Sequence, residues 1–172
     1  MKKLLLILTV GLIALAGCSS NDVMKGYPKL KGKNHQFVTE SYTDIVTNME
    51  NKVPGVYYIG FPDCPWCQVL APELNTILKD HDLKANLINI RSSEFENNEI
   101  LQERLAEFMK TFNAGAENSK GSVPFIVAIS KDGIVDGHLG ITPDYNDNTK
   151  PLTEAQREYL TARLDYLFQD IK

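Results

Sequence analysis

Two cysteines separated by two residues, Cys64 and Cys67, carry the clearest chemical signal in the chain. They follow an extended apolar run, Val56 to Ile59, at the point where a helical pattern begins. A cysteine in the first turn of a helix directs its sulfur at unpaired backbone N–H groups and at the positive end of the helix dipole, which favours the thiolate. The spacing therefore predicts Cys64 as an attacking nucleophile and Cys67, one turn further along, as the resolving thiol of a thiol-disulfide exchange.

Some residues around the two cysteines support this prediction, and one opposes it. Pro65 suits the first position of a helix, where its missing N–H would have no partner anyway. Trp66 and Phe61 offer apolar surface beside the sulfur, and for Phe61 packing is the favoured interpretation. Asp63 is adjacent to Cys64, and its negative charge would raise the pKa of that thiol and oppose the helix dipole.

Other uses of the cysteine pair stay open at this point. A structural zinc site would need a second pair of ligands, and the three histidines, His35, His81 and His138, are not at ligand spacing from one another. An inert structural disulfide is possible, although an exposed helix start is a poor place for one. The sequence favours a redox-active dithiol and predicts neither a metal site nor a cofactor.

Hydrophobic periodicity predicts a single α/β domain built around these cysteines. Strands are predicted at 37–38, 56–59, 85–90, 127–130 and 134–135, and helices at 41–49, from 65 to near 80, at 98–112, and from a capping box at Thr153 to Gln156 onward. Residues 91–94 read as a polar loop. This order of elements predicts a central mixed sheet with helices on both faces.

Two separated motifs resemble the thioredoxin family. The run Cys64-Pro-Trp-Cys-Gln-Val-Leu-Ala-Pro-Glu-Leu resembles the active-site helix of thioredoxins, including Pro72 within that helix. The segment Gly121 to Val127 resembles the one whose proline is cis and faces the cysteines, and residues 131–140 resemble the closing hairpin. The resemblance implies a thioredoxin-like fold over about residues 35–172. It also implies that Val123 and Pro124 pair with a bound client chain like an added strand, with Pro65 and Trp66 beside it.

The chain departs from the thioredoxin pattern in two places. Thioredoxins have a buried aspartate six positions before the first cysteine, associated with proton transfer to the second thiol, and this chain has Tyr58 there. The dipeptide between the cysteines is Pro-Trp rather than Gly-Pro, closer to the pairs of glutaredoxins and Dsb-type oxidases. The proton-transfer group for Cys67 and the direction of electron flow are therefore left open.

The N-terminus reads as an export signal. Lys2 and Lys3 precede an apolar run from Leu4 to Ala16, which is too short for a comfortable membrane span. The run ends in Leu15-Ala16-Gly17-Cys18, which resembles a bacterial lipobox. By that resemblance residues 1–17 are a lipoprotein signal peptide, Cys18 carries the lipid, and residues 18–36 are a flexible tether to a domain at 37–172. An ordinary cleaved signal with a chance cysteine is the alternative.

Composition narrows the possible partners. The full chain has a formal net charge of −4, which becomes more negative when Lys2 and Lys3 are removed, and this argues against nucleic acid as a ligand. If Cys18 is lipidated, only Cys64 and Cys67 remain of the three cysteines. We expect a monomer held at the outer side of the cell membrane by its lipid.

These observations lead to one main functional hypothesis and two others. The first is an extracytoplasmic thiol-disulfide oxidoreductase that acts on exported cysteine-containing proteins and exchanges electrons with a membrane or extracytoplasmic redox partner. The second is a thioredoxin-like accessory or client-binding module, such as a bacteriocin transport accessory protein, in which redox turnover is secondary. Copper or zinc handling by the dithiol is the third.

Overall fold

A computed structural model of the chain describes residues 22–112, 118 and 121–172. The strands are Phe37–Val38 (β1), Gly55–Gly60 (β2), Ala85–Asn89 (β3), Phe125–Ile129 (β4) and Val135–Leu139 (β5). The helices are Tyr42–Glu50 (α1), Pro65–Asp80 (α2), Ser93–Glu96 (α3), Glu99–Phe108 (α4) and Glu154–Phe168 (α5). The predicted signal peptide (residues 1–17) and the predicted lipidation site Cys18 lie outside the described residues.

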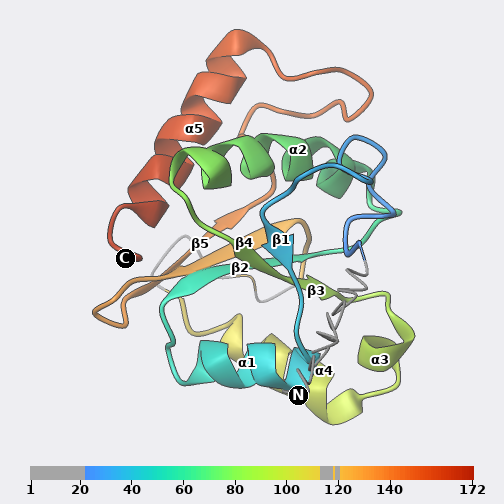
Figure 1. Ribbon diagram of the computed structural model, residues 1–172, viewed down its shortest axis with the longest axis vertical. Helices are drawn as coiled ribbons and strands as arrows, with labels where there is room; N and C mark the ends of the chain where they lie inside the picture. Colours follow the sequence, from blue (N-terminus) through green and yellow to red (C-terminus); the bar gives the residue numbers. More distant parts are fainter. Residues whose placement is uncertain (1–21, 113–117, 119–120) are drawn as a thin grey trace, which may run out of the picture.

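The strands form one mixed sheet in the order β1-β3-β2-β4-β5 (Figure 1). Strand β2 lies at the centre, parallel to β3 on one side and antiparallel to β4 on the other, and β4 pairs antiparallel with β5. Helices α2 and α5 cover one face, and α1, α3 and α4 cover the other (Figure 1). The predicted α/β class, with a mixed central sheet and helices on both faces, is confirmed.

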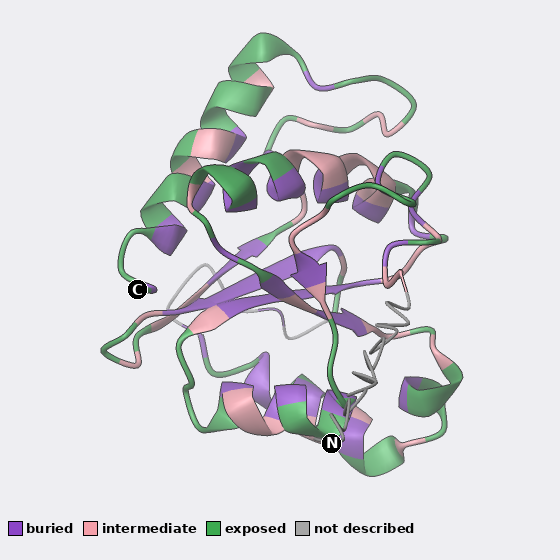
Figure 2. Ribbon diagram, in the orientation of Figure 1, coloured by how far each residue is buried: buried purple, intermediate pink, exposed green. Residues whose placement is uncertain are grey.

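The central strand is buried on both faces because its side chains alternate between two apolar cores (Figure 2). Val56 and Tyr58 point into the core beneath α2 and α5, and Tyr57 and Ile59 into the core beneath α1 and α4. A strand covered on both faces reads as a continuous apolar run, which is the pattern that predicted it. The strand that leads into the cysteines is thus held rigidly from both sides.

The other predicted elements are present with small differences. The predicted loop at 91–94 contains the start of α3, whose first turn is capped by Ser92. Helix α4 ends at Phe108 rather than at 112, and Ile100, predicted on its apolar side, is 71% exposed. Helix α5 opens with the predicted capping box of Thr153 and Gln156, but Tyr159 from its predicted apolar stripe is half exposed.

The predicted tether is wrong for residues 22–36, which pack onto the domain as a strap of successive turns. Met24, Tyr27 and Leu30 are buried in the same core as α2 and α5. The Asp22 carboxylate fastens the strap by accepting hydrogen bonds from the backbone N–H groups of Met24 and Gly32. Polar composition indicated a linker, but three buried apolar side chains, one in every three residues from Met24 to Leu30, are enough to anchor the segment to the domain.

Candidate active site

The end of β2 and the start of α2 position the two cysteines. Cys64 is the N-cap of α2 and has extended backbone dihedrals, and Pro65 takes up the first helical position as predicted. The Cys64 sulfur accepts a hydrogen bond from the backbone N–H of Cys67 at 3.2 Å. A sulfur that caps a helix replaces the usual serine or aspartate oxygen, so a negative charge on it is stabilised by the same orphan donors.

These contacts lower the pKa of Cys64 from its ordinary value of 9.0 to about 7. The largest cause is a hydrogen bond from the Cys67 side chain, and the backbone N–H groups of Cys67 and Trp66 add to it against the opposing effect of burial. Asp63 is exposed to solvent, and the groups that set this pKa are those of the helix start. About half of Cys64 is therefore thiolate at neutral pH, the form that attacks disulfides.

Cys67 has the opposite character. Its side chain is fully buried, whereas Cys64 is 4% exposed. The hydrogen bond that Cys67 gives to Cys64, together with burial, raises its pKa far above the ordinary value. The two thiols therefore differ in the way that thiol-disulfide exchange requires: Cys64, the less deeply buried, is partly ionised at neutral pH, and Cys67 stays protonated behind it.

The Val123–Pro124 segment lies beside the cysteines, because it directly precedes β4 and Phe125 of β4 pairs with Ile59 at the end of β2. The peptide bond between these residues is cis, as the resemblance implied. The Val123 carbonyl lies 4.0 Å from the Cys64 sulfur and accepts a hydrogen bond from the protonated thiol. Pro124 is buried and Val123 is half-buried, so backbone groups of this segment border the space in front of the nucleophile.

The dipeptide between the cysteines contributes surface to the site. Pro65 is exposed and Trp66 is half-buried, with its indole packed edge-on against the Tyr145 ring at 5.6 Å. Phe61 is half-buried beneath the Arg91 guanidinium, 5.6 Å from its ring centroid, in agreement with a packing role. Both aromatic side chains pack against the core cluster that contains Cys64 and Cys67.

No protein family model matches the chain. Among solved structures, the crystal structure of thioredoxin O2 from Arabidopsis thaliana in its oxidized state is similar, with 13% sequence identity and a TM-score of 0.49. The similarity covers 78% of this chain and 96% of that chain. The strand order of this protein, its cysteine pair at the start of α2 and the cis proline opposite them agree with the sequence resemblance. The fold is thioredoxin-like.

The strap of residues 22–36 touches the active-site loop of this thioredoxin-like domain. Gln68 on α2 donates hydrogen bonds to the carbonyls of Gly26 and Pro62, and so joins the strap to the loop that leads into Cys64. A Cβ atom on Gly26 would lie 2.6 Å from the Cβ of Pro62, so only glycine fits this close approach. Local sequence patterns do not indicate this contact, since it joins segments far apart in the chain.

Two buried tyrosines lie behind Cys67. Tyr58 is fully buried on β2, and Tyr27 of the strap is 1% exposed in the same core. In the sequence, Tyr58 stands out only as a departure from the thioredoxin pattern. Tyr27 was not predicted as part of the site, because residues 18–36 were predicted to form a flexible tether. The only available signal was the spacing of Met24, Tyr27 and Leu30 at every third residue.

The histidines occupy three different places, and each bonds to another group. His35 contacts Asp22 at 3.0 Å, His81 contacts Asp165 at 2.8 Å, and His138 donates to the Ile141 carbonyl at 2.9 Å. Within residues 22–112, 118 and 121–172, no three histidine, cysteine, aspartate or glutamate side chains gather as a metal site would need. The described cysteines have no second ligand pair beside them, so the geometry gives no support to a zinc site.

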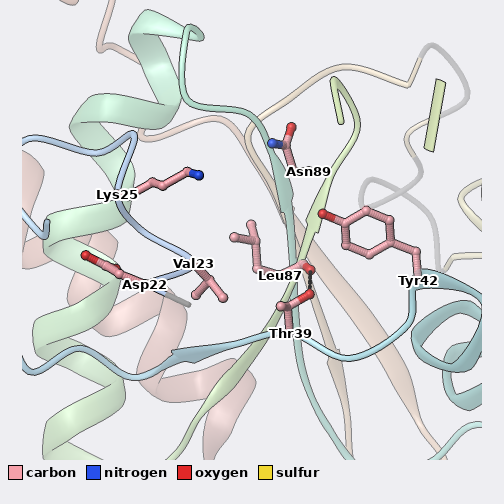
Figure 3. Close-up of a pocket in the computed structure, with 7 residues that line it drawn as sticks. All are labelled: Asp22, Val23, Lys25, Thr39, Tyr42, Leu87 and Asn89. Atoms are coloured by element: carbon pink, nitrogen blue, oxygen red, sulfur yellow. Dashed lines mark hydrogen bonds between the residues drawn. The ribbon is translucent and has the colours of Figure 1, made fainter. Parts of the chain in front are cut away.

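A cavity of about 310 Å³ lies apart from the cysteines, between the strap and the end of β3 (Figure 3). Its wall includes Asp22 and Lys25 from the strap and Asn89 from β3, and Thr39 donates to the Leu87 carbonyl beside it. It is lined by neither cysteine nor histidine. None of its lining residues thus belongs to the candidate active site at the start of α2.

None of the helices in the described part of the chain has the length and apolar character needed to cross a lipid bilayer.

Proposed function

We propose that this protein is an extracytoplasmic thiol-disulfide oxidoreductase in which Cys64 attacks and Cys67 resolves. The observation that carries the proposal is the contrast between the two thiols on one helix turn. Cys64 has a pKa lowered to about 7 and Cys67 has a raised pKa, and the Cys64 sulfur is hydrogen-bonded to the Cys67 N–H at 3.2 Å. A pair of this kind forms a mixed disulfide at the outer sulfur and releases it by attack of the inner one.

The proposed clients are exported proteins that contain cysteines. Their chain would lie along the backbone of Val123 and Pro124, which borders the nucleophile and offers main-chain groups for pairing as in an added strand. Pro65 and Trp66 would contact the client on the other side of the sulfur. A membrane or extracytoplasmic redox partner would restore the dithiol or disulfide after each turnover.

The proposed location is the outer side of the cell membrane, with lipid on Cys18. The lipobox-like run Leu15 to Cys18 and the apolar segment before it support this proposal. Two acyl chains would anchor the protein stably, since each buried CH₂ contributes about 0.8 kcal/mol. Mass spectrometry of the protein extracted from membranes tests this step, and an unmodified Cys18 in the membrane-extracted protein would contradict it.

The reduction potential of the Cys64–Cys67 couple tests the redox function. A strong oxidase with a first-thiol pKa of about 3.5 stabilises its reduced form at pH 7 by roughly 4–5 kcal/mol, equivalent to about 100 mV. Cys64, with a pKa of about 7, gains little in this way. We therefore expect a potential nearer to about −270 mV than to about −120 mV, the value of a reductase rather than of a strong oxidase.

The measurement is equilibration of the protein in glutathione buffers, with the Cys64→Ser and Cys67→Ser variants as controls. A reversible two-electron couple that both variants lose supports the proposal. A reduction potential near −120 mV would still support a redox function, but it would mean that the protein oxidises its clients rather than reducing them. Full activity of the Cys64→Ser, Cys67→Ser double variant in the host would contradict the enzyme and favour the client-binding module.

A further inference from the structure

The inner thiol has to lose its proton in a fully buried position. Cys67 is 0% exposed, and burial together with its hydrogen bond to Cys64 raises its pKa. Once a client is bound to Cys64 through a disulfide, Cys64 is no longer a thiolate that can accept that hydrogen bond. A buried thiolate with no donor to stabilise it is costly, so another group should stabilise the charge that develops on the Cys67 sulfur.

The Tyr58 hydroxyl is placed for this role. A Cβ atom on Gly60 would lie 3.1 Å from the Cys67 sulfur and 3.1 Å from the Tyr58 hydroxyl oxygen, so both atoms line the same small space beside Gly60. The hydroxyl donates to the Cys67 carbonyl at 3.5 Å, a distance at the outer limit for a hydrogen bond. Such a weakly held hydroxyl can turn toward the sulfur of the same residue when a charge develops there.

A second hydroxyl lies in the same core. Tyr27 is 1% exposed, and its hydroxyl has no hydrogen-bond partner among the described residues. A buried hydroxyl without a hydrogen-bond partner destabilises the folded protein, so stability alone does not account for this one. The strap therefore brings a spare donor into the region behind the cysteines, where chains of hydroxyls strengthen one another's hydrogen bonds.

We propose that the Tyr58 hydroxyl, supported by that of Tyr27, donates a hydrogen bond to the Cys67 thiolate and accelerates the resolving step. The proposal rests on the proposed redox function and names the group that takes the place of the aspartate found in thioredoxins. It assigns to the strap a contribution to the chemistry as well as to folding.

The step conserves atoms and electrons. The Cys67 thiolate attacks the Cys64 sulfur of the mixed disulfide, a bond forms between the two cysteines, and the bond from Cys64 to the client sulfur breaks. The electron pair of that bond leaves with the client sulfur, which takes up a proton equivalent to the one that Cys67 lost. The client disulfide is thus reduced by the two electrons that the dithiol gives up. In the reverse direction, Tyr58 stabilises Cys67 as the leaving thiolate.

Tyr58 acts as a donor and not as a base. Burial raises its pKa well above the ordinary value, so the phenol keeps its proton throughout. The Tyr58 hydroxyl and the backbone N–H of Phe61 are the groups that favour the charged form of Cys67. The other titratable groups that act on Cys67, Tyr58 and Tyr27 are Cys64 on the same helix and Tyr42 on α1.

The test separates the two steps with a small disulfide, dithiobis(nitrobenzoate), used at equal concentration with the reduced full-length protein. All variants carry Cys18→Ser, so that Cys64 and Cys67 are the only thiols. Attack by Cys64 releases one coloured thionitrobenzoate, and resolution by Cys67 releases the second. In Tyr58→Phe we expect the first release to stay within about twofold and the second to slow by about 10- to 100-fold at pH 7, the range for loss of one hydrogen bond to a charge.

The pH profile distinguishes this role from a structural one. The midpoint of the second release should move to higher pH in Tyr58→Phe, and Tyr27→Phe should move it in the same direction by less. Tyr57→Phe is the matched control, because it removes a buried hydroxyl from the neighbouring position on β2, where it donates to Val53 in the other core. Tyr57→Phe should change neither release.

Three outcomes would overturn the proposal: an unchanged second release in Tyr58→Phe, equal slowing of both releases, or an unmoved pH midpoint. Failure of the proposed redox function is seen in a different measurement, since the glutathione equilibration would then show no reversible two-electron couple of Cys64 and Cys67 in the parent protein. Thermal unfolding of each variant shows whether the fold is retained, and Tyr58→Phe keeps the ring that packs against Phe37.

Discussion

Removal of the Cys67 sulfur should make Cys64 a much weaker nucleophile at neutral pH. The largest contribution to the lowered pKa of Cys64 is the hydrogen bond from the Cys67 side chain, and Cys67→Ala deletes it. The backbone N–H of residue 67 stays in place at 3.2 Å, so the helix start still contributes. The variant therefore isolates the side-chain hydrogen bond from the effect of the helix.

The size of the effect follows from the energy of such a bond. A hydrogen bond to a charged group contributes about 1.5–3 kcal/mol, and 1.36 kcal/mol changes an ionisation constant tenfold. Cys64 is 4% exposed, so solvent screening reduces this little. The pKa of Cys64 should rise from about 7 most of the way to the ordinary value of 9.0. Its thiolate fraction at pH 7 should then fall from about half to a few per cent.

The assay is the rate of alkylation of Cys64 by iodoacetamide as a function of pH, in a Cys18→Ser background. We expect the rate at pH 7 to fall by about 5- to 50-fold in Cys67→Ala and the midpoint to move upward. Cys67→Ser keeps a hydroxyl donor at the same position, so its alkylation rate and its pH midpoint should lie between those of the parent protein and of Cys67→Ala. A midpoint in Cys67→Ala that matches the parent protein would refute the reasoning and assign the lowered pKa to the helix start alone.

Two further predictions concern the fold. Met24→Ala should lower the free energy of unfolding by about 2–4 kcal/mol in urea titrations, because Met24 is fully buried. The control is Lys25→Ala at the exposed neighbouring position, which should change the free energy of unfolding by less than about 0.5 kcal/mol. Equal, small effects of the two substitutions would mean that the strap does not pack against the domain. Burial lowers the pKa of His138 in the folded protein below its ordinary value of 6.5. As the pH drops below about 6.5, the His138 imidazole is therefore protonated in the unfolded chain but stays neutral in the folded protein. The free energy of unfolding should fall over this pH range. Replacement by a side chain that does not titrate, His138→Gln, should flatten this fall, and an unchanged slope would exclude His138 as its source.

The opposite pKa shifts of Cys64 and Cys67 have the same local cause. The helix start and the Cys67 side chain stabilise charge on Cys64, and the same hydrogen bond, with burial, withholds charge from Cys67. The difference in ionisation between the two thiols is thus set by local structure. The Val123 carbonyl, 4.0 Å from the Cys64 sulfur, comes to this arrangement from a distant part of the chain.

Much of the fold was present in local sequence patterns. The apolar run at Val56 to Ile59 predicted a strand buried on both faces, and the Thr153 to Gln156 capping box predicted the start of the last helix. Periodicity was less reliable at single positions: Ile100 and Tyr159 fit an apolar stripe but are exposed. A stripe defines a face of a helix, and only packing decides how far that face is covered.

The sequence by itself determined the chemistry, because two cysteines one helix turn apart, with proline at the first helical position, dictate a capped thiolate through purely local geometry. Only the tertiary structure decided what surrounds them. Three buried side chains turned a polar stretch into a strap, and a glycine at residue 26 let it reach Pro62. The strap and β2 together brought Tyr27 and Tyr58 behind Cys67. Burial depends on contacts between segments far apart in the chain, and neither composition nor spacing records them.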